Sequence, residues 1–169
     1  MVASARIHLV PVQHWSGRGI YDRMRTLWGG WVVETPQLRF LFCGDSGYSP
    51  DFRDIAARFG SFDLAAIPIG AYEPRWFMQA NHLNPAEAVQ AMQDLNARYA
   101  VAIHWGTFEL SDEPLDEPPR ALAAALARRN IPATRFFVLQ HGATRRLSPL
   151  LGPAKPSELS AMQRRGAPV

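Results

Sequence analysis

The chain has 169 residues, of which 47% are hydrophobic and 20% are charged, and its formal net charge is +3. This length fits a single domain, and no apolar run approaches the roughly 20 residues that a membrane-spanning helix needs. The positive charge is mild and scattered, which suits anionic partners but argues against nucleic acid. The single cysteine, Cys43, excludes an intramolecular disulfide. The first residues contain no basic region followed by an apolar core, so we expect no signal peptide and a cytoplasmic location.

Strand and helix patterns alternate along the chain as far as residue 147. Runs of β-branched and aromatic residues predict strands at 6–12, 29–35, 38–43, 62–70, 99–104 and 136–139. Ser49-Pro50 and Asn84-Pro85 predict helices that end near Gly60 and Ala97, and a third helix is expected from about Pro119 to Arg129. This order predicts an α/β fold, with one domain over residues 1–147. Residues 148–169, rich in Pro, Ser, Ala, Gly and Arg, are expected to form a disordered tail.

Three of the predicted strands end in a side chain that can bind a metal ion. His14 follows the strand at 6–12, Asp45 follows the strand at 38–43, and His104 ends the strand at 99–104. In sheets with helices between the strands, ligands gather at the carboxyl ends of the strands. Zinc accepts imidazole nitrogen and carboxylate oxygen, and two metal ions can share a site. Taken singly, each residue is better explained as a turn or capping residue, but together the three predict a metal site.

The remaining histidines carry weaker signals. His8 lies inside an apolar strand and is expected to be structural. His82 lies in a loop before a predicted helix, and its spacing alone suggests a surface position. His141 lies at the end of the last predicted strand and needs no further role.

A fourth strand end leads into an unusual loop at residues 71–78, which mixes aromatic, acidic and basic side chains. Arg75 and Trp76 in this loop can form the wall of a pocket for an anionic, partly apolar substrate. The alternative is that the loop only packs against the domain.

Six segments between residues 7 and 147 form a specific set: Pro11-Val-Gln-His-Trp15, Trp28-Gly-Gly-Trp31, Gly44-Asp-Ser-Gly-Tyr48, Pro68-Ile-Gly-Ala-Tyr-Glu-Pro-Arg-Trp-Phe-Met78, His82-Leu-Asn-Pro-Ala-Glu-Ala88 and Ala102-Ile-His-Trp-Gly-Thr-Phe108. They resemble the metallo-β-lactamase-fold phospholipases D that hydrolyse N-acyl-phosphatidylethanolamine, over the second half of that fold only. The resemblance implies an α/β architecture that is the C-terminal half of a four-layer αβ/βα sandwich, a mixed sheet with flanking helices. It also implies hydrolysis of a phosphodiester bond at a centre of two zinc ions.

The same resemblance assigns roles to individual residues. It implies that His14 is a ligand of the first zinc, Asp45 the carboxylate that bridges the two zincs, and His104 a ligand of the second. Asp45 and His82 are then the catalytic residues, with His82 beside the substrate. The substrate is a phospholipid or another anionic phosphodiester, reached by peripheral contact with a membrane. Its contacts are expected from Tyr72, Glu73, Arg75, Trp76 and His82.

One motif of the family has no counterpart in this chain. The His-x-His-x-Asp-His motif supplies four further ligands, but the sequence contains no His-x-His. Each zinc is left with two protein ligands, whereas a catalytic zinc normally has three. We therefore expect a hydrolase fragment that is inactive alone and has an uncovered apolar sheet face. The alternatives are a degenerate, non-catalytic protein that associates with itself through that face, and a lactonase-type hydrolase of the same fold.

Overall fold

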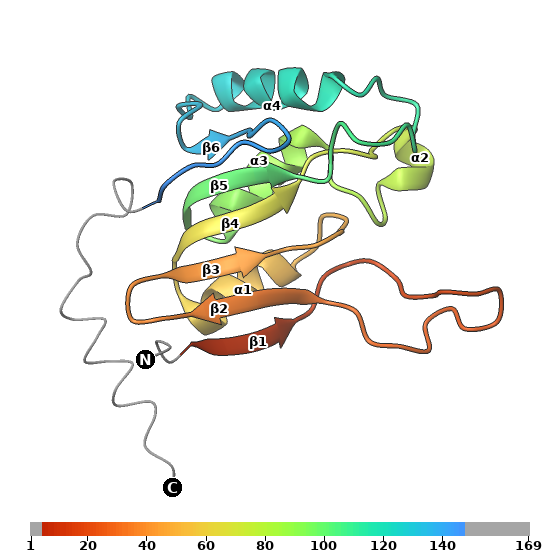
Figure 1. Ribbon diagram of the computed structural model, residues 1–169, viewed down its shortest axis with the longest axis horizontal. Coiled ribbons are helices and arrows are strands. Elements are labelled where there is room, and N and C mark those ends of the chain that lie inside the picture. Colours follow the sequence, from red (N-terminus) through yellow and green to blue (C-terminus); the bar gives the residue numbers. More distant parts are fainter. Residues whose placement is uncertain (1–4, 148–169) are drawn as a thin grey trace, which may run out of the picture.

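The computed structural model describes residues 5–147, which form one six-stranded sheet (Figure 1). The strands are β1 (Arg6–Val10), β2 (Gly30–Glu34), β3 (Arg39–Phe42), β4 (Phe62–Pro68), β5 (Ala97–Ile103) and β6 (Phe136–Phe137), and they lie in this order across the sheet. β2 is antiparallel to both β1 and β3, whereas β3, β4, β5 and β6 are parallel to one another. The predicted mixed sheet is confirmed, and β2 and β3 form an antiparallel hairpin within it.

Four strands end at the same edge of the sheet. β1 and β3 have the same direction because each is antiparallel to β2, and β4 and β5 are parallel to β3. Their carboxyl ends therefore meet at the edge from which the long loop between β1 and β2 extends, on the right in Figure 1. β4 lies inside the sheet and is buried over Leu64–Pro68, as expected of a strand that is apolar on both faces.

Four helices accompany the sheet in the described part of the chain: α1 (Asp51–Phe59), α2 (Arg75–Met78), α3 (Pro85–Asp94) and α4 (Glu117–Arg128). α1 and α3 lie behind the sheet in Figure 1, and α4 packs against α3. Together they cover one face, where the core contains the fully buried side chains of Val32, Leu41, Ile67, Val89 and Leu122.

Two of the three helix starts that the sequence predicted, those at Ser49-Pro50 and Asn84-Pro85, are confirmed. α1 begins directly after Ser49-Pro50, and the Ser49 hydroxyl accepts the Asp51 N–H at 3.3 Å. Asn84 caps α3, because its side chain accepts the Glu87 N–H while the Glu87 carboxylate accepts the Asn84 N–H. This reciprocal arrangement satisfies two backbone donors that a helix end would otherwise leave free.

The other face of the sheet carries no helix in the described residues (Figure 1). The register places Leu9 opposite Trp31 and Trp31 opposite Phe42, so these side chains form a row on that face. Leu9 is 44% exposed, Trp31 45% and Phe42 42%. The uncovered apolar face expected from the sequence is therefore present among these residues.

Some boundaries differ from the prediction. α4 begins at Glu117 rather than Pro119, because a proline in the first turn of a helix loses no backbone hydrogen bond. β5 begins at Ala97 rather than Tyr99, and α2 was not predicted because its four residues are too few to produce a helical period. The tail predicted at 148–169 lies outside the described residues. Within residues 5–147, no helix is long and apolar enough to cross a membrane.

Candidate metal centre

A short backbone contact joins the loop after β1 to the loop after β3. Gln13 and Gly47 form an isolated antiparallel bridge, in which the Gly47 N–H donates to the Gln13 carbonyl at 2.8 Å. The Gln13 N–H donates in turn to the Ser46 hydroxyl at 3.1 Å. Because His14 follows Gln13 and Asp45 precedes Ser46, this contact brings the imidazole and the carboxylate together.

The loop after β3 also holds the segment that carries His82. The Leu83 N–H donates to the Ser46 carbonyl at 2.8 Å. The backbone at Gly47 approaches Ala80 so closely that a Cβ at Gly47 would lie 2.5 Å from the Ala80 carbonyl oxygen. Only glycine permits this approach, and it positions His82 between the two strand ends.

His82 is half-buried, and its ring lies between two of the predicted ligands. Its centroid is 5.2 Å from the ring of His14 and 5.6 Å from that of His104. The surface position that spacing alone suggested for His82 is wrong. The reason is tertiary, since the backbone contacts of the neighbouring residues turn this loop inward.

His104 reaches the cluster from the end of β5 with a left-handed backbone conformation, φ 55°. Its Nε2 lies 3.3 Å from Asp45 Oδ1. Gly70 lies directly against the backbone of His104, and a Cβ at Gly70 would be 2.3 Å from the His104 carbonyl oxygen. The three strand-end residues are thus brought together with His82.

The protonation of His14 suits a metal ligand. Its Nδ1 lies 3.0 Å from the Trp15 carbonyl oxygen, which can only accept a hydrogen bond. In a neutral ring, this contact places the hydrogen on Nδ1 and leaves the lone pair of Nε2 free for a metal ion. Such a hydrogen bond on the second nitrogen is the usual way in which a metal-binding imidazole is oriented.

Two nitrogens of the cluster, His14 Nε2 and His82 Nδ1, are buried and have no hydrogen-bond partner among residues 5–147. Buried polar atoms are rarely left unsatisfied, because each costs about 1–3 kcal/mol. His14, Asp45 and His82 can each offer one ligand atom, and these atoms lie within 4.8 Å of one another. This donor set fits a metal ion of the kind that accepts imidazole and carboxylate.

The electrostatics of Asp45 and His82 agree with metal binding, whereas His104 favours the protonated form and would have to lose its proton to bind a metal ion. Burial would raise the pKa of Asp45, but the hydrogen bond with His104 and the neighbouring imidazoles outweigh burial and hold this pKa below its usual value. The same hydrogen bond raises the pKa of His104, whereas burial lowers the pKa of His82. The cluster thus combines an ionised carboxylate with a neutral imidazole at His82, and metal ligands must be in these forms.

The cluster opens into a cavity of about 430 Å³, called here the metal-side cavity. Arg23, from the loop between β1 and β2, is the cationic side chain of its lining and lies 5.3 Å above the ring of Trp15. A guanidinium at this position suits an anionic group. Apart from the cluster, the lining consists of Trp15, Arg23, Ala71, Phe77, Met78, Asn81 and Leu110.

Of the side chains expected to contact substrate, His82 lines this cavity, whereas Tyr72, Glu73 and Arg75 make contacts around α2 instead. Arg75 Nη2 lies 2.8 Å and 3.0 Å from the two carboxylate oxygens of Glu87, and its Nη1 donates to two backbone carbonyls. Glu73 accepts the Arg75 N–H at 2.9 Å. Tyr72 is buried, and burial raises its pKa to about 12. Trp76 differs from these three because it is 80% exposed.

Sequence reasoning missed several residues of the cavity. Phe77 and Met78, the neighbours of Trp76, line it, but nothing in their spacing distinguishes them from Trp76. Arg23 had only one signal, its place in a glycine-bearing loop after His14. The other histidines agree with expectation, since His8 lies 3.2 Å from the carboxylate of Glu34, outside the cluster.

The chain was compared with known proteins. The family model described as a beta-lactamase superfamily domain matches residues 1–105. N-acyl-phosphatidylethanolamine-hydrolyzing phospholipase D 1 of Caenorhabditis elegans is 42% identical over 139 residues, which are 80% of this chain and 39% of that protein. Outer membrane protein RomA of Klebsiella pneumoniae is 41% identical over 100 residues, 59% of this chain and 74% of that protein. The chain thus spans well under half the length of the nematode relative.

Solved structures give the fold. Igni18, a metallo hydrolase from the archaeon Ignicoccus hospitalis, matches with a TM-score of 0.58 and 20% identity, over 83% of this chain and 52% of that chain. The isothiocyanate hydrolase from Delia radicum gut bacteria matches with a TM-score of 0.61 and 14% identity, over 85% and 54%. The sheet, its helices and the family match together identify the chain as a member of the β-lactamase superfamily, with the metallo-β-lactamase fold and homology to the phospholipases D that hydrolyse N-acyl-phosphatidylethanolamine.

Proposed function

We propose that the cluster at the strand ends is the C-terminal part of a zinc centre that hydrolyses the phosphodiester bond of N-acyl-phosphatidylethanolamine-like phospholipids. The observation that carries the proposal is the pair of buried, unpartnered nitrogens, His14 Nε2 and His82 Nδ1, in a cluster with the carboxylate of Asp45. The name of the relative that is 42% identical supports the substrate class.

His14, Asp45 and His104 would hold the zinc ions. When bound, zinc acts as a Lewis acid on a phosphoryl oxygen and lowers the pKa of water. His104 orients Asp45 through the 3.3 Å contact between Nε2 and Oδ1. His82 lies beside the substrate and, because burial lowers its pKa, is neutral and able to accept a proton.

The anionic phosphodiester lies in the metal-side cavity, where Arg23 offers a positive charge. Of the loop residues expected to touch substrate, Trp76 is exposed beside the cavity-lining Phe77 and contacts the lipid. Tyr72, Glu73 and Arg75 act indirectly, because their contacts hold α2 against the domain.

Exposed apolar side chains near the cavity support peripheral contact with a membrane. The loop that carries Arg23 also bears Ile20, Tyr21 and Leu27, which are 90%, 86% and 88% exposed. Amphipathic surfaces of this kind, with basic and large apolar residues, bind at lipid interfaces. The proposed surface would let a phospholipid enter the cavity from the bilayer.

We do not expect the chain to turn over substrate alone. The cluster provides one carboxylate and three imidazoles, whereas two catalytic zincs with three protein ligands each need more donors. The absence of His-x-His in the 169 residues agrees with this count. Completion of the centre by further polypeptide is therefore part of the proposal.

The test supplies that polypeptide. The chain is joined to the part of the nematode relative that precedes the matched region, loaded with zinc, and assayed on vesicles containing N-acyl-phosphatidylethanolamine. We expect zinc-dependent hydrolysis that is lost in Asp45→Asn and kept in Gly19→Ala, a position with free space for a Cβ. Hydrolysis of a lactone but not of the phospholipid would support the lactonase alternative, and zinc binding without either activity would contradict the proposal.

The exposed row of Leu9, Trp31 and Phe42 favours a second, non-catalytic function, self-association through the uncovered face. Apolar patches of this kind mark interaction surfaces. Light scattering on the purified chain tests it. A dimer that dissociates in Trp31→Lys, but not in the control Leu27→Lys, a position that is 88% exposed and outside this row, would support self-association, whereas a monomer would exclude it.

A further inference from the structure

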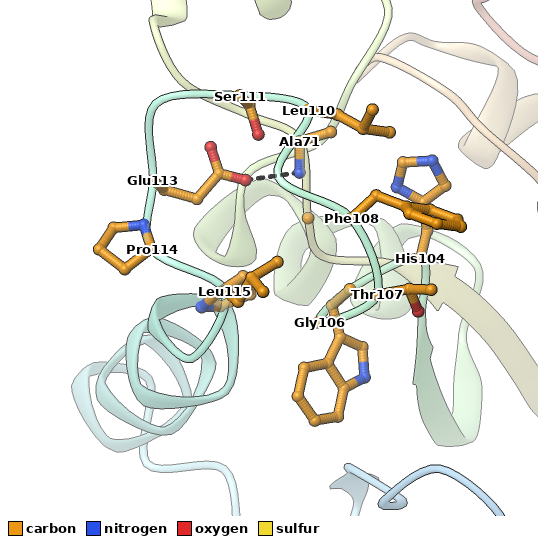
Figure 2. A pocket seen from close by; sticks show the side chains of 13 residues that line it. Ala71, His104, Gly106, Thr107, Phe108, Leu110, Ser111, Glu113, Pro114 and Leu115 are labelled. Atoms are coloured by element: carbon orange, nitrogen blue, oxygen red, sulfur yellow. Dashed lines mark hydrogen bonds between the residues drawn. The ribbon is translucent and has the colours of Figure 1, made fainter.

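A second cavity adjoins the metal-side cavity on the other side of His104. Its volume is about 310 Å³, at the lower end of the roughly 300–1,000 Å³ typical of small-molecule sites. The two cavities share Ala71, His104 and Leu110 in their linings, so they lie next to each other. Most of the second lining comes from the segment after β5, residues 104–118 (Figure 2).

The lining of this second cavity is mainly apolar. Trp105, Phe108, Leu110, Leu115 and Pro118 contribute to it, and the Leu115 side chain points into the space (Figure 2). Phe108 and Leu110 are 72% and 65% exposed, so they form an open apolar rim rather than a closed core. An alkyl group that enters this space removes its own apolar surface and that of the lining from contact with water, which favours binding.

Glu113, the anionic side chain of the lining, already accepts hydrogen bonds from the backbone. Glu113 accepts the Ala71 N–H at 2.6 Å, which Figure 2 draws as a dashed line, and the Tyr72 N–H at 3.2 Å. Its second oxygen accepts the Glu73 N–H at 2.9 Å. The carboxylate therefore fixes the wall of the cavity, and its negative charge disfavours an anionic group there.

The two cavities thus differ in chemistry although they adjoin each other. The metal-side cavity contains Arg23 and the imidazoles, which suit an anionic head group, and the second cavity suits an uncharged, apolar chain. A ligand with both parts has only one favourable orientation. We propose that the second cavity binds an unbranched alkyl or acyl chain of the substrate while the phosphate lies at the metal centre.

This inference rests on the proposed function for the position of the phosphate. It adds that the wall of the second cavity determines which chain lengths of the substrate fit. The residues that determine chain length are those that point into the space, above all Leu115. The preformed wall at Glu113 means that the chain enters a cavity already shaped for it, with little ordering on binding.

The experiment is a binding series that needs no turnover. The zinc-loaded chain is titrated with butyl, hexyl, octyl and decyl phosphate by calorimetry, with inorganic phosphate as the reference for the head group alone. We expect affinity to rise about fourfold per methylene, equivalent to about 0.8 kcal/mol, until the cavity is full. Leu115→Phe reduces the space in the second cavity. It should lower the affinity for decyl phosphate at least tenfold and leave the affinity for butyl phosphate unchanged.

Ile7→Phe is the control, because Ile7 is 64% exposed and lies outside both linings. Affinity that does not depend on chain length, or equal effects of the two variants, would overturn the inference while phosphate binding at the metal centre still stood. Failure of inorganic phosphate to bind, with the chain-length series intact, would instead count against the proposed function.

A second measurement covers the case in which Leu115→Phe does not fold. Trp105 lines the second cavity, so its fluorescence should be quenched by decyl phosphate that carries a bromine at the chain end. The quenching should disappear in Trp105→Phe. Quenching that persists at full strength in that variant would locate the chain near another tryptophan and refute the inference.

Discussion

Gly47→Ala is the substitution that most directly tests how the cluster is assembled. The new Cβ would lie 2.5 Å from the carbonyl oxygen of Ala80 and 2.9 Å from that of Gln79. Real Cβ atoms essentially never come within 3.0 Å of such an atom, so the segment must move by at least about 0.5 Å. That segment leads directly into His82, and the neighbouring Gly47 N–H holds the loop that carries His14.

The loss of stability expected for Gly47→Ala depends on the rigidity of the backbone carbonyls that the new Cβ would meet. Backbone carbonyls, unlike the ends of flexible side chains, cannot rotate away, and overpacking of this kind destabilises a protein by about 1–3 kcal/mol. Displacement of the loop that carries His14, which the Gly47 N–H holds through Gln13, should also weaken zinc binding by roughly tenfold or more, as losses of ligand orientation do.

The assay is urea unfolding of the apo chain together with zinc titration against a competing chelator. The control is Gly19→Ala, where the nearest atom to a new Cβ is 3.8 Å away, an ordinary contact. Gly47→Ala should unfold at lower urea and bind zinc more weakly than this control. Equal unfolding midpoints and equal zinc affinities in the two variants would refute the account of how the loops are joined.

Three further outcomes are expected. Asp45→Asn keeps the shape of the side chain but removes its charge, so zinc affinity should fall at least tenfold with little change in the urea midpoint; unchanged zinc affinity would exclude Asp45 as a ligand. Arg75→Ala should destabilise the chain by about 1–2 kcal/mol, because it removes a partly exposed ion pair with Glu87 and two hydrogen bonds to backbone carbonyls. In a completed enzyme, the same substitution should change KM to a similar extent for anionic and neutral substrates. A KM effect confined to anionic substrates would instead give Arg75 a substrate contact. Burial raises the pKa of the Cys43 thiol to about 12 and excludes reagents, so Cys43 should react with a thiol reagent only after unfolding; rapid reaction of the folded chain would contradict its burial.

The sequence predicted the strand-end residues because their placement depends on local patterns. His14, Asp45 and His104 each follow an apolar run, and the shared direction of β1, β3 and β5 brings such positions to one edge. The capping box of Asn84 and Glu87 was predictable for the same reason, since both partners lie within one helical turn.

The misplaced residues depend on contacts between distant parts of the chain. His82 joins the cluster because Leu83 donates to Ser46, a contact that no local period indicates. Arg75 was expected to face substrate, but Glu87 lies within reach only after α2 and α3 are folded together. A charged residue in a loop cannot be assigned to substrate or to a partner before its neighbours in space are known.

The most direct test of the metal centre is the response of the five histidines to zinc. The account predicts that titration with zinc, followed by NMR of the imidazole groups, shifts His14, His82 and His104 at a common saturation point. His8, paired with Glu34, and His141, hydrogen-bonded to Thr107, should keep their resonances. Unchanged signals from His14, His82 and His104, or equal shifts of all five, would contradict a metal centre at the strand ends.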